Sequence, residues 1–367
     1  MSNIAAWNLY KTTLHCKRPF KIATGVSDTC HGLLLELRDE QGRSGWGEGV
    51  PLPVLTGETL NGACSALCDI WLPGLIGRDP THFQGLRTWM HKTLVGHTAA
   101  RCAVDLALHD LVARQWNIPC WKLLGGNNRA VATNYSIGLC PPSEAAEQAR
   151  SLVECEYQII KLKIGEDPDL DLERVAAVRA AIGPDIRLRV DANEGWNYLQ
   201  AQRFLRRAGA YHIEFIEQPL ARSDWEGLRR LRQQSSVPIC ADESLRGVQE
   251  ARQLAQLEAV DIFNLKLMKC GGLMEAREIV TIARAHGIAL MVGGMVGESS
   301  LAVGAATALA SSLGFEYADL DADLLLRDSC WSLEPPCPQV GWRQNPSSSG
   351  WGLGDPDHSR LERVAGS

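Results

Sequence analysis

The chain lacks the features that would place it in several large classes of protein. None of its 12 cysteines forms a C-x-x-C pair, so neither a zinc ribbon nor a thioredoxin-like redox motif is predicted. No run of about 20 apolar residues occurs, and the first residues are not a basic segment that leads into an apolar one. We therefore expect no membrane span and no secretory leader, and scattered thiols are typical of a reducing cytoplasm.

An excess of positive charge is also missing. The formal net charge is -6, and the basic cluster of Lys17, Arg18 and Lys21 is too short to bind a polyanion. Nucleic acid is therefore not an expected partner. With 45% hydrophobic and 22% charged residues, the composition is that of a folded globular protein, and 367 residues are enough for a barrel and one smaller domain.

The first 126 residues predict an α+β domain, in which a small antiparallel sheet is followed by helices. Two segments, 17–30 and 50–58, are rich in Pro, Gly, Thr and Ser, and we expect them to be loops. A turn at 41–45 joins two of the strands into a hairpin. The expected strands and helices cover residues 4–12, 32–39, 43–49, 59–76, 80–93 and 98–116.

From residue 127 the pattern changes, and short apolar runs alternate with longer amphipathic segments. Eight runs at intervals of roughly 25 residues predict an α/β fold, a (β/α)7-8 modified TIM barrel over residues 127–327. The eighth helix has little support, because residues 328–357 are rich in Pro, Ser, Gly and Trp. We expect residues 328–367 to pack back on the N-terminal domain. The runs are 132–137, 159–163, 186–191, 213–217, 238–242, 262–266, 289–292 and 315–320.

Charged residues end five consecutive predicted strands. The first ends in K-L-K-I-G at 161–165, where Lys161 and Lys163 point the same way because side chains alternate across a strand. In such a barrel the active site lies at the C-terminal ends of the strands, so we expect the charged side chains to meet there. The next four strands end in Asp191, Glu217, Asp242 and Lys266.

The carboxylates of Asp191, Glu217 and Asp242 are candidate metal ligands. Unpaired carboxylates a few ångströms apart repel one another, so one must be protonated or a cation must lie between them. Oxygen ligands with no His or Cys nearby favour Mg²⁺, or Mn²⁺, over zinc. The sequence therefore predicts a Mg²⁺ site with Lys163 on one side and Lys266 on the other.

This arrangement suits the removal of a proton next to a carboxylate. A Mg²⁺ ion can stabilise the enolate that forms when the α-proton leaves. A lysine beside a divalent cation and a second ammonium group loses its proton more easily, so Lys163, with Lys161 as its neighbour, can act as a base. Two bases on opposite faces, Lys163 and Lys266, would invert a stereocentre by 1,1-proton transfer.

At these residues the chain resembles the enolase superfamily, in its muconate-lactonising branch. The resemblance implies a capping domain whose lids at 17–30 and 50–58 close over the barrel and exclude water. It implies that Lys163 and Lys266 are the acid/base pair, that Lys161 is the electrostatic neighbour of Lys163, and that Asp191, Glu217 and Asp242 bind Mg²⁺. Asn193 and Glu243 would support these ligands. The matching segments are K-L-K-I-G at 161–165, V-D-A-N at 190–193, E-Q-P-L at 217–220, A-D-E-S at 241–244 and N-L-K-L-M-K-C-G-G at 264–272.

Several isomerases and lyases share this frame: muconate-type cycloisomerases, o-succinylbenzoate synthases, N-acylamino acid racemases and dipeptide epimerases. Asp319 and Asp321 alternate onto one side at the eighth strand end, and a pair of carboxylates suits a substrate with a free ammonium group. This D-x-D resembles that of dipeptide epimerases, where it binds the N-terminal ammonium. We therefore expect a Mg²⁺-dependent dipeptide epimerase that interconverts L,L- and L,D-dipeptides. The other activities, and a non-catalytic binding protein, are the alternatives.

Three positions bear on the choice of dipeptide. The resemblance implies that epimerases acting on Ala-Glu carry an Arg in the first lid. This chain has Gly25 at that position, which argues against Ala-Glu as its substrate. Val296, near the end of the seventh strand, favours an apolar second side chain. Glu298, if it points inward, would bind a cationic one, and we favour the apolar alternative. In dipeptide epimerases a small residue and Pro usually follow the D-x-D, whereas here Ala322 is followed by Asp323. Members of the family are often oligomeric, which leaves a homo-oligomer open.

Overall fold

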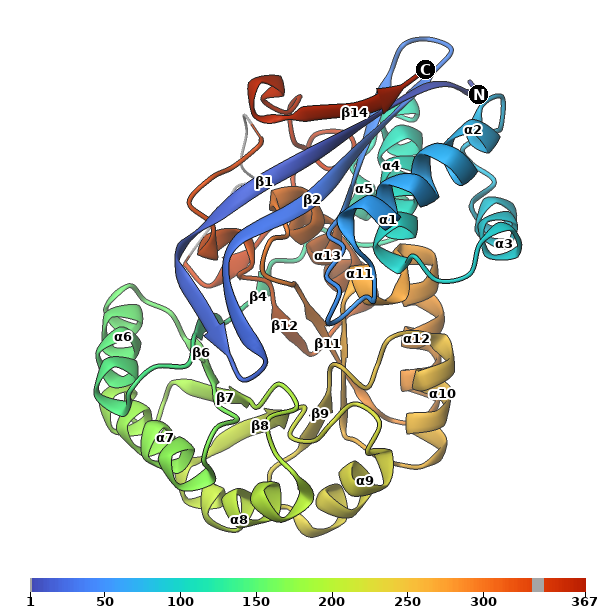
Figure 1. Ribbon diagram of the computed structural model, residues 1–367. Coiled ribbons are helices and arrows are strands. Elements are labelled where there is room, and N and C mark those ends of the chain that lie inside the picture. The colour runs from blue at the N-terminus through green and yellow to red at the C-terminus, as the bar shows by residue number, and fades with distance from the viewer. Residues whose placement is uncertain (1, 332–339) are drawn as a thin grey trace.

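The computed structural model describes residues 2–331 and 340–367 (Figure 1). An eight-stranded parallel sheet curls into a barrel, and a four-stranded antiparallel sheet with its helices lies over one end of that barrel. The predicted (β/α) barrel with an α+β capping domain is therefore confirmed. Among the described residues, no helix combines the length and the apolar character needed to cross a membrane.

The N-terminal sheet has the strand order β14-β1-β2-β3, with β1 (Ile4–Ile22), β2 (Gly25–Asp39), β3 (Ser44–Gly49) and β14 (Glu362–Gly366). Helix α4 (Thr98–Gln115) packs closely against β3. A Cβ atom on Gly47 would lie only 1.9 Å from the carbonyl oxygen of Ala103. Glycine at this position makes the close packing of helix on strand possible. The other helices here are α1 (Leu60–Ser65), the π-helical η1 (Ala66–Trp71), α2 (Leu72–Leu75), α3 (Phe83–Thr93) and α5 (Cys120–Leu123).

The hairpin of β1 and β2 is longer than the sequence predicts. We expected a loop at 17–30, but strand pairing continues to Ile22 and Gly25. That prediction was wrong because this part of the hairpin projects from the sheet, where polar residues pair as strands without having to bury one face. A register shift between His15 and Phe20 interrupts the ladder, and beyond it the hairpin reaches over the barrel strands (Figure 1). The second lid, at 50–58, is a loop as expected.

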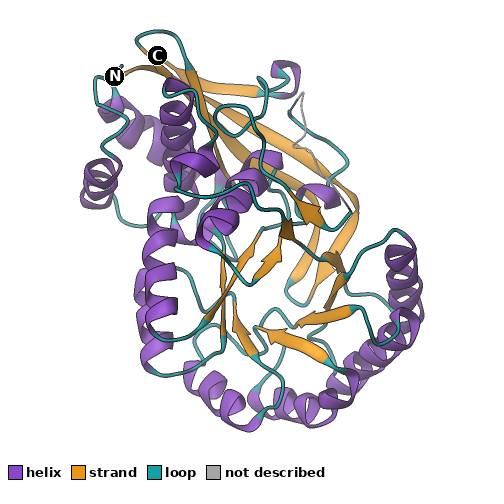
Figure 2. Ribbon diagram, turned by 180° about the vertical axis from the view of Figure 1, so that it is seen from behind, coloured by secondary structure: helices purple, strands orange, loops and turns teal. Residues whose placement is uncertain are grey.

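The barrel strands run parallel in the order β12-β11-β10-β9-β8-β7-β6-β5, and helices surround them (Figure 2). The strands are β5 (Tyr135–Ile137), β6 (Ile159–Lys163), β7 (Arg187–Asp191), β8 (Ile213–Glu217), β9 (Ile239–Ala241), β10 (Ile262–Leu265), β11 (Ala289–Gly293) and β12 (Tyr317–Asp319). The helices are α6 (Pro142–Glu154), α7 (Pro168–Ile182), α8 (Tyr198–Ala208), α9 (Trp225–Gln234), α10 (Val248–Gln256), α11 (Leu267–Cys270), α12 (Leu273–Ala285) and α13 (Ser300–Leu313).

The register of the central strands brings their carboxyl ends to one level. Lys163 of β6 is paired with Asp191 of β7, and Asp191 is paired with Glu217 of β8. Glu217 is paired in turn with Cys240 of β9, and Asp242 follows that strand. Because the strands are parallel, the side chains at these ends point to the same rim of the barrel.

A seam separates β12 from β5. Within the described residues no backbone ladder joins these two strands, and β12 is followed by the 3₁₀ turn η3 (Asp323–Leu325) rather than by an outer helix. Side chains bridge the seam instead. The backbone N–H of Leu320 donates to Thr133 Oγ1 at 2.7 Å, and that of Ser136 donates to Asp321 Oδ2 at 2.6 Å.

The C-terminal segment returns to the capping domain. Strand β14 pairs antiparallel with β1, so the two ends of the chain lie close together (Figure 1). Before it, Trp351 is buried and donates its backbone N–H to Asp110 Oδ1 at 2.8 Å and its indole N–H to the carbonyl of Trp46 at 3.1 Å. A short strand, β13 (Trp342–Arg343), pairs with β4 (Val131–Ala132), which precedes the first barrel strand β5. These contacts tie the segment to both parts of the molecule.

Candidate active site

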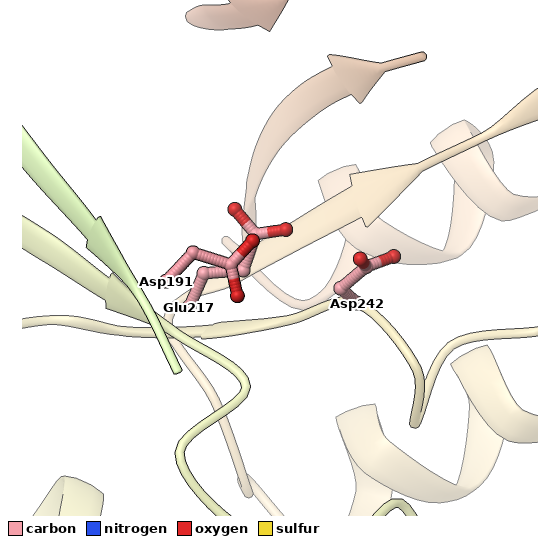
Figure 3. A group of neighbouring side chains, drawn as sticks. All are labelled: Asp191, Glu217 and Asp242. Carbon is pink, nitrogen blue, oxygen red and sulfur yellow. The ribbon is translucent and has the colours of Figure 1, made fainter. Parts of the chain in front are cut away.

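Three carboxylates meet at the barrel mouth (Figure 3). Asp191 and Glu217 are the last residues of β7 and β8, and Asp242 directly follows β9. One oxygen from each lies within 4.8 Å of the other two, and each residue is at most 1% exposed. Oxygens that share a Mg²⁺ ion at about 2.1 Å are about 3 to 4 Å apart, so small side-chain rotations would complete the set. The three predicted ligands are thus brought together, and as hard oxygen donors they fit Mg²⁺.

Burial and mutual repulsion control the protonation of these carboxylates. Burial and the neighbouring Asp191 raise the pKa of Glu217 to about 7. Burial acts on Asp242 as well, but the ammonium groups of Lys266 and Lys269 hold the pKa of Asp242 far below its usual range. A divalent cation at this point would displace the proton from Glu217, because a metal ligand must be deprotonated.

Two lysines flank the carboxylates. Lys163 Nζ lies 2.6 Å from Asp191 Oδ2, and Lys266 Nζ lies 2.8 Å from Asp242 Oδ2. Burial lowers the pKa of Lys266, but the carboxylates of Asp242 and Glu217 outweigh burial and raise it. Because Lys163 ends β6 and Lys266 follows β10, the two ammonium groups approach from opposite sides of the three ligand-bearing strands. A substrate over the ligands would therefore have one lysine on either face.

Lys161 lies deeper in the barrel and is 1% exposed. Its Nζ atom is 2.6 Å from Asp319 Oδ2, 3.1 Å from Asp191 Oδ2 and 2.8 Å from Glu217 Oε2, although the last contact lacks hydrogen-bond geometry. Burial would lower the pKa of Lys161, but the carboxylates of Asp319, Glu217 and Asp191 raise it well above its usual range. Lys161 therefore stays charged beside Asp191, the partner of Lys163. Its electrostatic role toward Lys163 stays a prediction.

Asn193 and Glu243 lie beside the ligands. The backbone N–H of Asn193 donates to Asp191 Oδ1 at 2.9 Å, and its Nδ2 donates to Glu243 Oε1 at 3.1 Å. Burial and the carboxylates of Asp242 and Asp191 raise the pKa of Glu243 to about 8. Glu243 Oε2 has no hydrogen-bond partner among the described residues, and both side chains line the cavity above the carboxylates. Asn193 thus contacts Asp191 directly and Glu243 contacts Asn193, while their supporting roles stay predictions.

Asp319 and Asp321 reach the same cavity from the barrel seam. Asn134 Nδ2 donates to Asp319 Oδ1 at 2.6 Å, and Lys161 holds the pKa of Asp319 far below its usual range despite burial. Asp321 accepts the backbone N–H of Ser136, while burial and the charge of Asp319 raise the pKa of Asp321 to about 6. Asp321 thus contacts Ser136 and also presents its carboxyl group to the cavity.

Glu298 does not line the cavity, as far as the structure describes the chain. It is 2% exposed, and burial together with Glu48 raises the pKa of Glu298 to about 8. A protonated, buried carboxyl group is a poor partner for a cationic side chain, so its position gives no support to the predicted substrate contact. Val296 does line the cavity.

The cavity has a volume of about 390 Å³, and two lids cover it. Lys21 of the hairpin ties the first lid to the barrel, because its Nζ is 2.9 Å from Glu166 Oε1 and its carbonyl accepts the N–H of Leu139 at 2.8 Å. Arg222 ties the second lid, because its guanidinium donates to the carbonyl of Val54 at 2.9 Å. Both segments thus contact the barrel beside the cavity, which is the position that closure over the charged side chains would require.

Two residues that the sequence did not single out contact the candidate metal ligands. Lys269 Nζ donates to Asp242 Oδ1 at 2.5 Å, and Asn264 Nδ2 donates to Glu217 Oε1 at 2.7 Å. Both lie in the N-L-K-L-M-K stretch that we used for Lys266 alone. A polar residue in a strand otherwise made of apolar residues is the signal that would have indicated Asn264.

A second unpredicted pair supports Asp319. Arg189 donates to Asn134 Oδ1 at 3.0 Å, and Asn134 donates in turn to Asp319. Arg189 is 1% exposed inside the barrel, where its guanidinium carbon lies 5.2 Å from the ring of Phe215 and 5.3 Å from that of Tyr317, two rings that also contact each other. Alternation along β7 could have indicated Arg189, because it lies on the same side of that strand as Asp191. Asn134 has no comparable signal, since its partners are distant in the chain.

Two family models match the chain. Residues 8–125 match the mandelate racemase/muconate lactonizing enzyme N-terminal domain, and residues 144–354 match the enolase C-terminal domain-like model. Among known proteins, a hydrophobic dipeptide epimerase of Enterococcus faecalis is 36% identical over 83% of this chain and 86% of its own. An N-succinyl-L-Arg/Lys racemase of Bacillus cereus is 34% identical over 86% of this chain and 84% of its own.

Solved structures agree with these matches. The dipeptide epimerase of Enterococcus faecalis, complexed with Mg and L-Leu-L-Tyr, superposes with a TM-score of 0.93 at 32% identity, covering 97% of this chain and 100% of that one. The dipeptide epimerase of Cytophaga hutchinsonii, complexed with Mg and D-Ala-L-Val, gives a TM-score of 0.93 at 31% identity, covering 99% of both chains.

Proposed function

Because the chain belongs to the mandelate racemase/muconate lactonizing enzyme family of the enolase superfamily, we propose that it is a Mg²⁺-dependent dipeptide epimerase. It interconverts L,L- and L,D-dipeptides at the α-carbon of the second residue. The observation that carries the proposal is one cavity lined by Lys163, Lys266, Asp319 and Asp321, above the carboxylates that can hold Mg²⁺. Free, mostly buried thiols fit an enzyme of the reducing cytoplasm.

The two lysines perform the proton transfer in this proposal. One of them removes the α-proton from its face of the substrate, and the other delivers a proton to the opposite face, which inverts the centre. Asp191, Glu217 and Asp242 would hold the Mg²⁺ ion, and that ion supplies the positive charge that stabilises the enolate. During the reaction, the contact of Glu166 with Lys21 keeps the first lid closed, and that of Arg222 with Val54 keeps the second lid closed.

Asp319 and Asp321 distinguish this reaction from its alternatives. The two carboxylates form an anionic end of the cavity, and a free ammonium group is the substrate group that pairs with it. Muconate carries no ammonium group, and in N-acylamino acids the α-amino group is blocked by the acyl group. An N-acylamino acid racemase remains the second candidate, because the Bacillus cereus relative is an N-succinyl-L-Arg/Lys racemase, but a neutral N-acyl linkage would bring no positive charge to Asp321, which has no cationic partner among the ion pairs of the described residues.

Deuterium exchange tests the proposed function directly. Pools of L,L-dipeptides incubated with the protein and Mg²⁺ in D₂O should gain deuterium at the second α-carbon and yield L,D products in chiral analysis. N-succinyl amino acids and muconate, incubated in parallel, should stay unchanged. Absence of exchange with every dipeptide would reject the proposal, and turnover of an N-succinyl amino acid alone would favour the racemase.

Asp321→Asn should raise the KM for dipeptides by about 10- to 100-fold, the effect of losing a hydrogen bond to a charged group. The substitution keeps the shape of the side chain and an oxygen for the N–H of Ser136. Steady-state kinetics should show a smaller change in kcat than in KM. An N-acetylated dipeptide, which lacks the free ammonium group, is the control, and any slow turnover of it should be unaffected by the substitution. An equal loss of activity with both substrates would contradict an ammonium-binding role of Asp321.

A further inference from the structure

The cavity has two unlike walls. Its floor carries the charged groups of the reaction. The opposite wall comes from the hairpin, the 50–58 loop, the segment after β11 and η3, and it is apolar. Its side chains are those of Phe20, Ile22, Leu52, Val54, Leu55, Val296 and Leu325.

One further cation lines the cavity besides the two lysines, among the described residues. This is Arg222, in the loop after β8, and Glu194, in the loop after β7, neutralises it. Glu194 Oε1 accepts the backbone N–H of Arg222 at 2.6 Å and its Nε–H at 3.0 Å, while Oε2 accepts from a terminal nitrogen at 2.5 Å. The other terminal nitrogen donates to the carbonyl of Val54. The guanidinium thus uses three of its five N–H groups within the protein, and its charge is paired with Glu194.

The cationic side chains of the first lid, as far as they are described, do not offer a free charge to the cavity. Lys17 and Arg18 are exposed and do not line the cavity, within the part of the chain that is described. Lys21 is paired with Glu166. Gly25 occupies the lid position at which epimerases that act on Ala-Glu are expected to carry an arginine, and glycine has no side chain. Among the residues that the structure describes, no unpaired cation therefore faces the apolar wall.

We propose that the enzyme prefers dipeptides whose second residue carries a bulky apolar side chain, and that Glu194 sets this preference by neutralising Arg222. The inference rests on the proposed function. With the ammonium at Asp319 and Asp321 and the α-carbon between Lys163 and Lys266, the second side chain faces the apolar wall. A carboxylate there would lose water without gaining a free cation. An apolar side chain would bury its surface against the wall.

A series of dipeptides that differ only in the second residue tests the preference. Deuterium exchange should give kcat/KM for L-Ala-L-Leu at least about tenfold above that for L-Ala-L-Glu and L-Ala-L-Lys, because a few buried methylene groups account for such a factor. Equal values across the series would overturn the inference and leave the proposed function intact. Absence of exchange with all three would instead reject the function.

Glu194→Gln tests the part played by the ion pair. Removing the negative charge should raise kcat/KM for L-Ala-L-Glu about two- to fivefold, as expected for a charge interaction at a partly exposed site, and leave L-Ala-L-Leu nearly unchanged. Glu226→Gln, in the exposed pair with Arg229 on α9, is the matched control and should alter neither value. The double variant Glu194→Gln with Arg222→Gln should lose the gain. A gain that persists in the double variant, or that applies equally to all substrates, would overturn the role of Glu194.

Discussion

Replacing Lys163 or Lys266 with alanine is expected to lower the rate of epimerisation by at least about a thousandfold. A positioned general acid or base contributes about 10²- to 10⁴-fold, and inversion requires both lysines. The remaining lysine can still remove and return a proton on its own face. Each variant should therefore exchange deuterium into one epimer only, and the two variants should differ in which epimer exchanges. Proton NMR in D₂O with chiral product analysis measures both quantities.

The two substitutions leave every neighbouring carboxylate with a cation. Asp191 keeps Lys161, at 3.1 Å, and Asp242 keeps Lys269, at 2.5 Å. The fold should therefore survive, which circular dichroism would verify. Lys92→Ala, at an exposed position of α3, is the control and should have the wild-type rate. Wild-type epimerisation by either catalytic variant would refute the assignment of two bases.

The positions of the charged strand ends follow from local properties of the sequence. Asp191, Glu217 and Asp242 each close a short apolar run, and the runs recur at the length of one strand and one helix. In a parallel barrel this regularity alone brings their side chains to one rim. The observed register pairs Asp191 with Glu217 directly. Candidate metal ligands on successive strands are therefore the part of the site that is best predicted from one sequence.

The hairpin and the seam depend on contacts between distant parts of the chain. Nothing near Asn134 indicates that it will donate to Asp319, because 185 positions separate the two residues. Segment 17–30 has a loop-like composition, but it is held as a strand by its partner and by Lys21, which pairs with Glu166. Such features are set by tertiary pairing rather than by local propensity, and sequence patterns do not report them.

The substrate preference is even harder to predict from the sequence. Val296 and Glu298 are two positions apart, yet Val296 lines the cavity and Glu298 does not. The pair of Glu194 and Arg222 is formed by two loops that follow different strands, so neither residue alone indicates that the charge is cancelled. The charged residues at the floor of the cavity can thus be predicted from the ends of the strands. The polarity of the opposite wall can be predicted only once the folded positions of the loops are known.

Glu217→Gln should abolish measurable turnover and weaken Mg²⁺ binding by at least about a hundredfold. Residues that merely support metal ligands are worth about 10- to 100-fold in affinity, and a direct ligand should be worth more. Asn264 donates to Glu217 Oε1 at 2.7 Å, and an amide oxygen can accept the same bond, so the fold should be kept. Titration calorimetry measures the affinity, with Glu226→Gln as the control. Chelation of the wild-type enzyme should cause the same loss of turnover, reversed by Mg²⁺.

The wild-type site should also bind Mg²⁺ more tightly as the pH rises. The pKa of Glu217 is raised to about 7 and that of Glu243 to about 8, so at low pH both carboxyl groups carry protons before the ion binds. Binding needs Glu217 as an anion and favours Glu243 as one, so protons are released and the apparent Kd falls as the pH passes through these values. Calorimetry at about pH 6 and about pH 9, in buffers of different ionisation enthalpy, measures that release. An affinity independent of pH would show that Glu217 is already ionised, and that the neighbouring ammonium groups alone balance the three carboxylates.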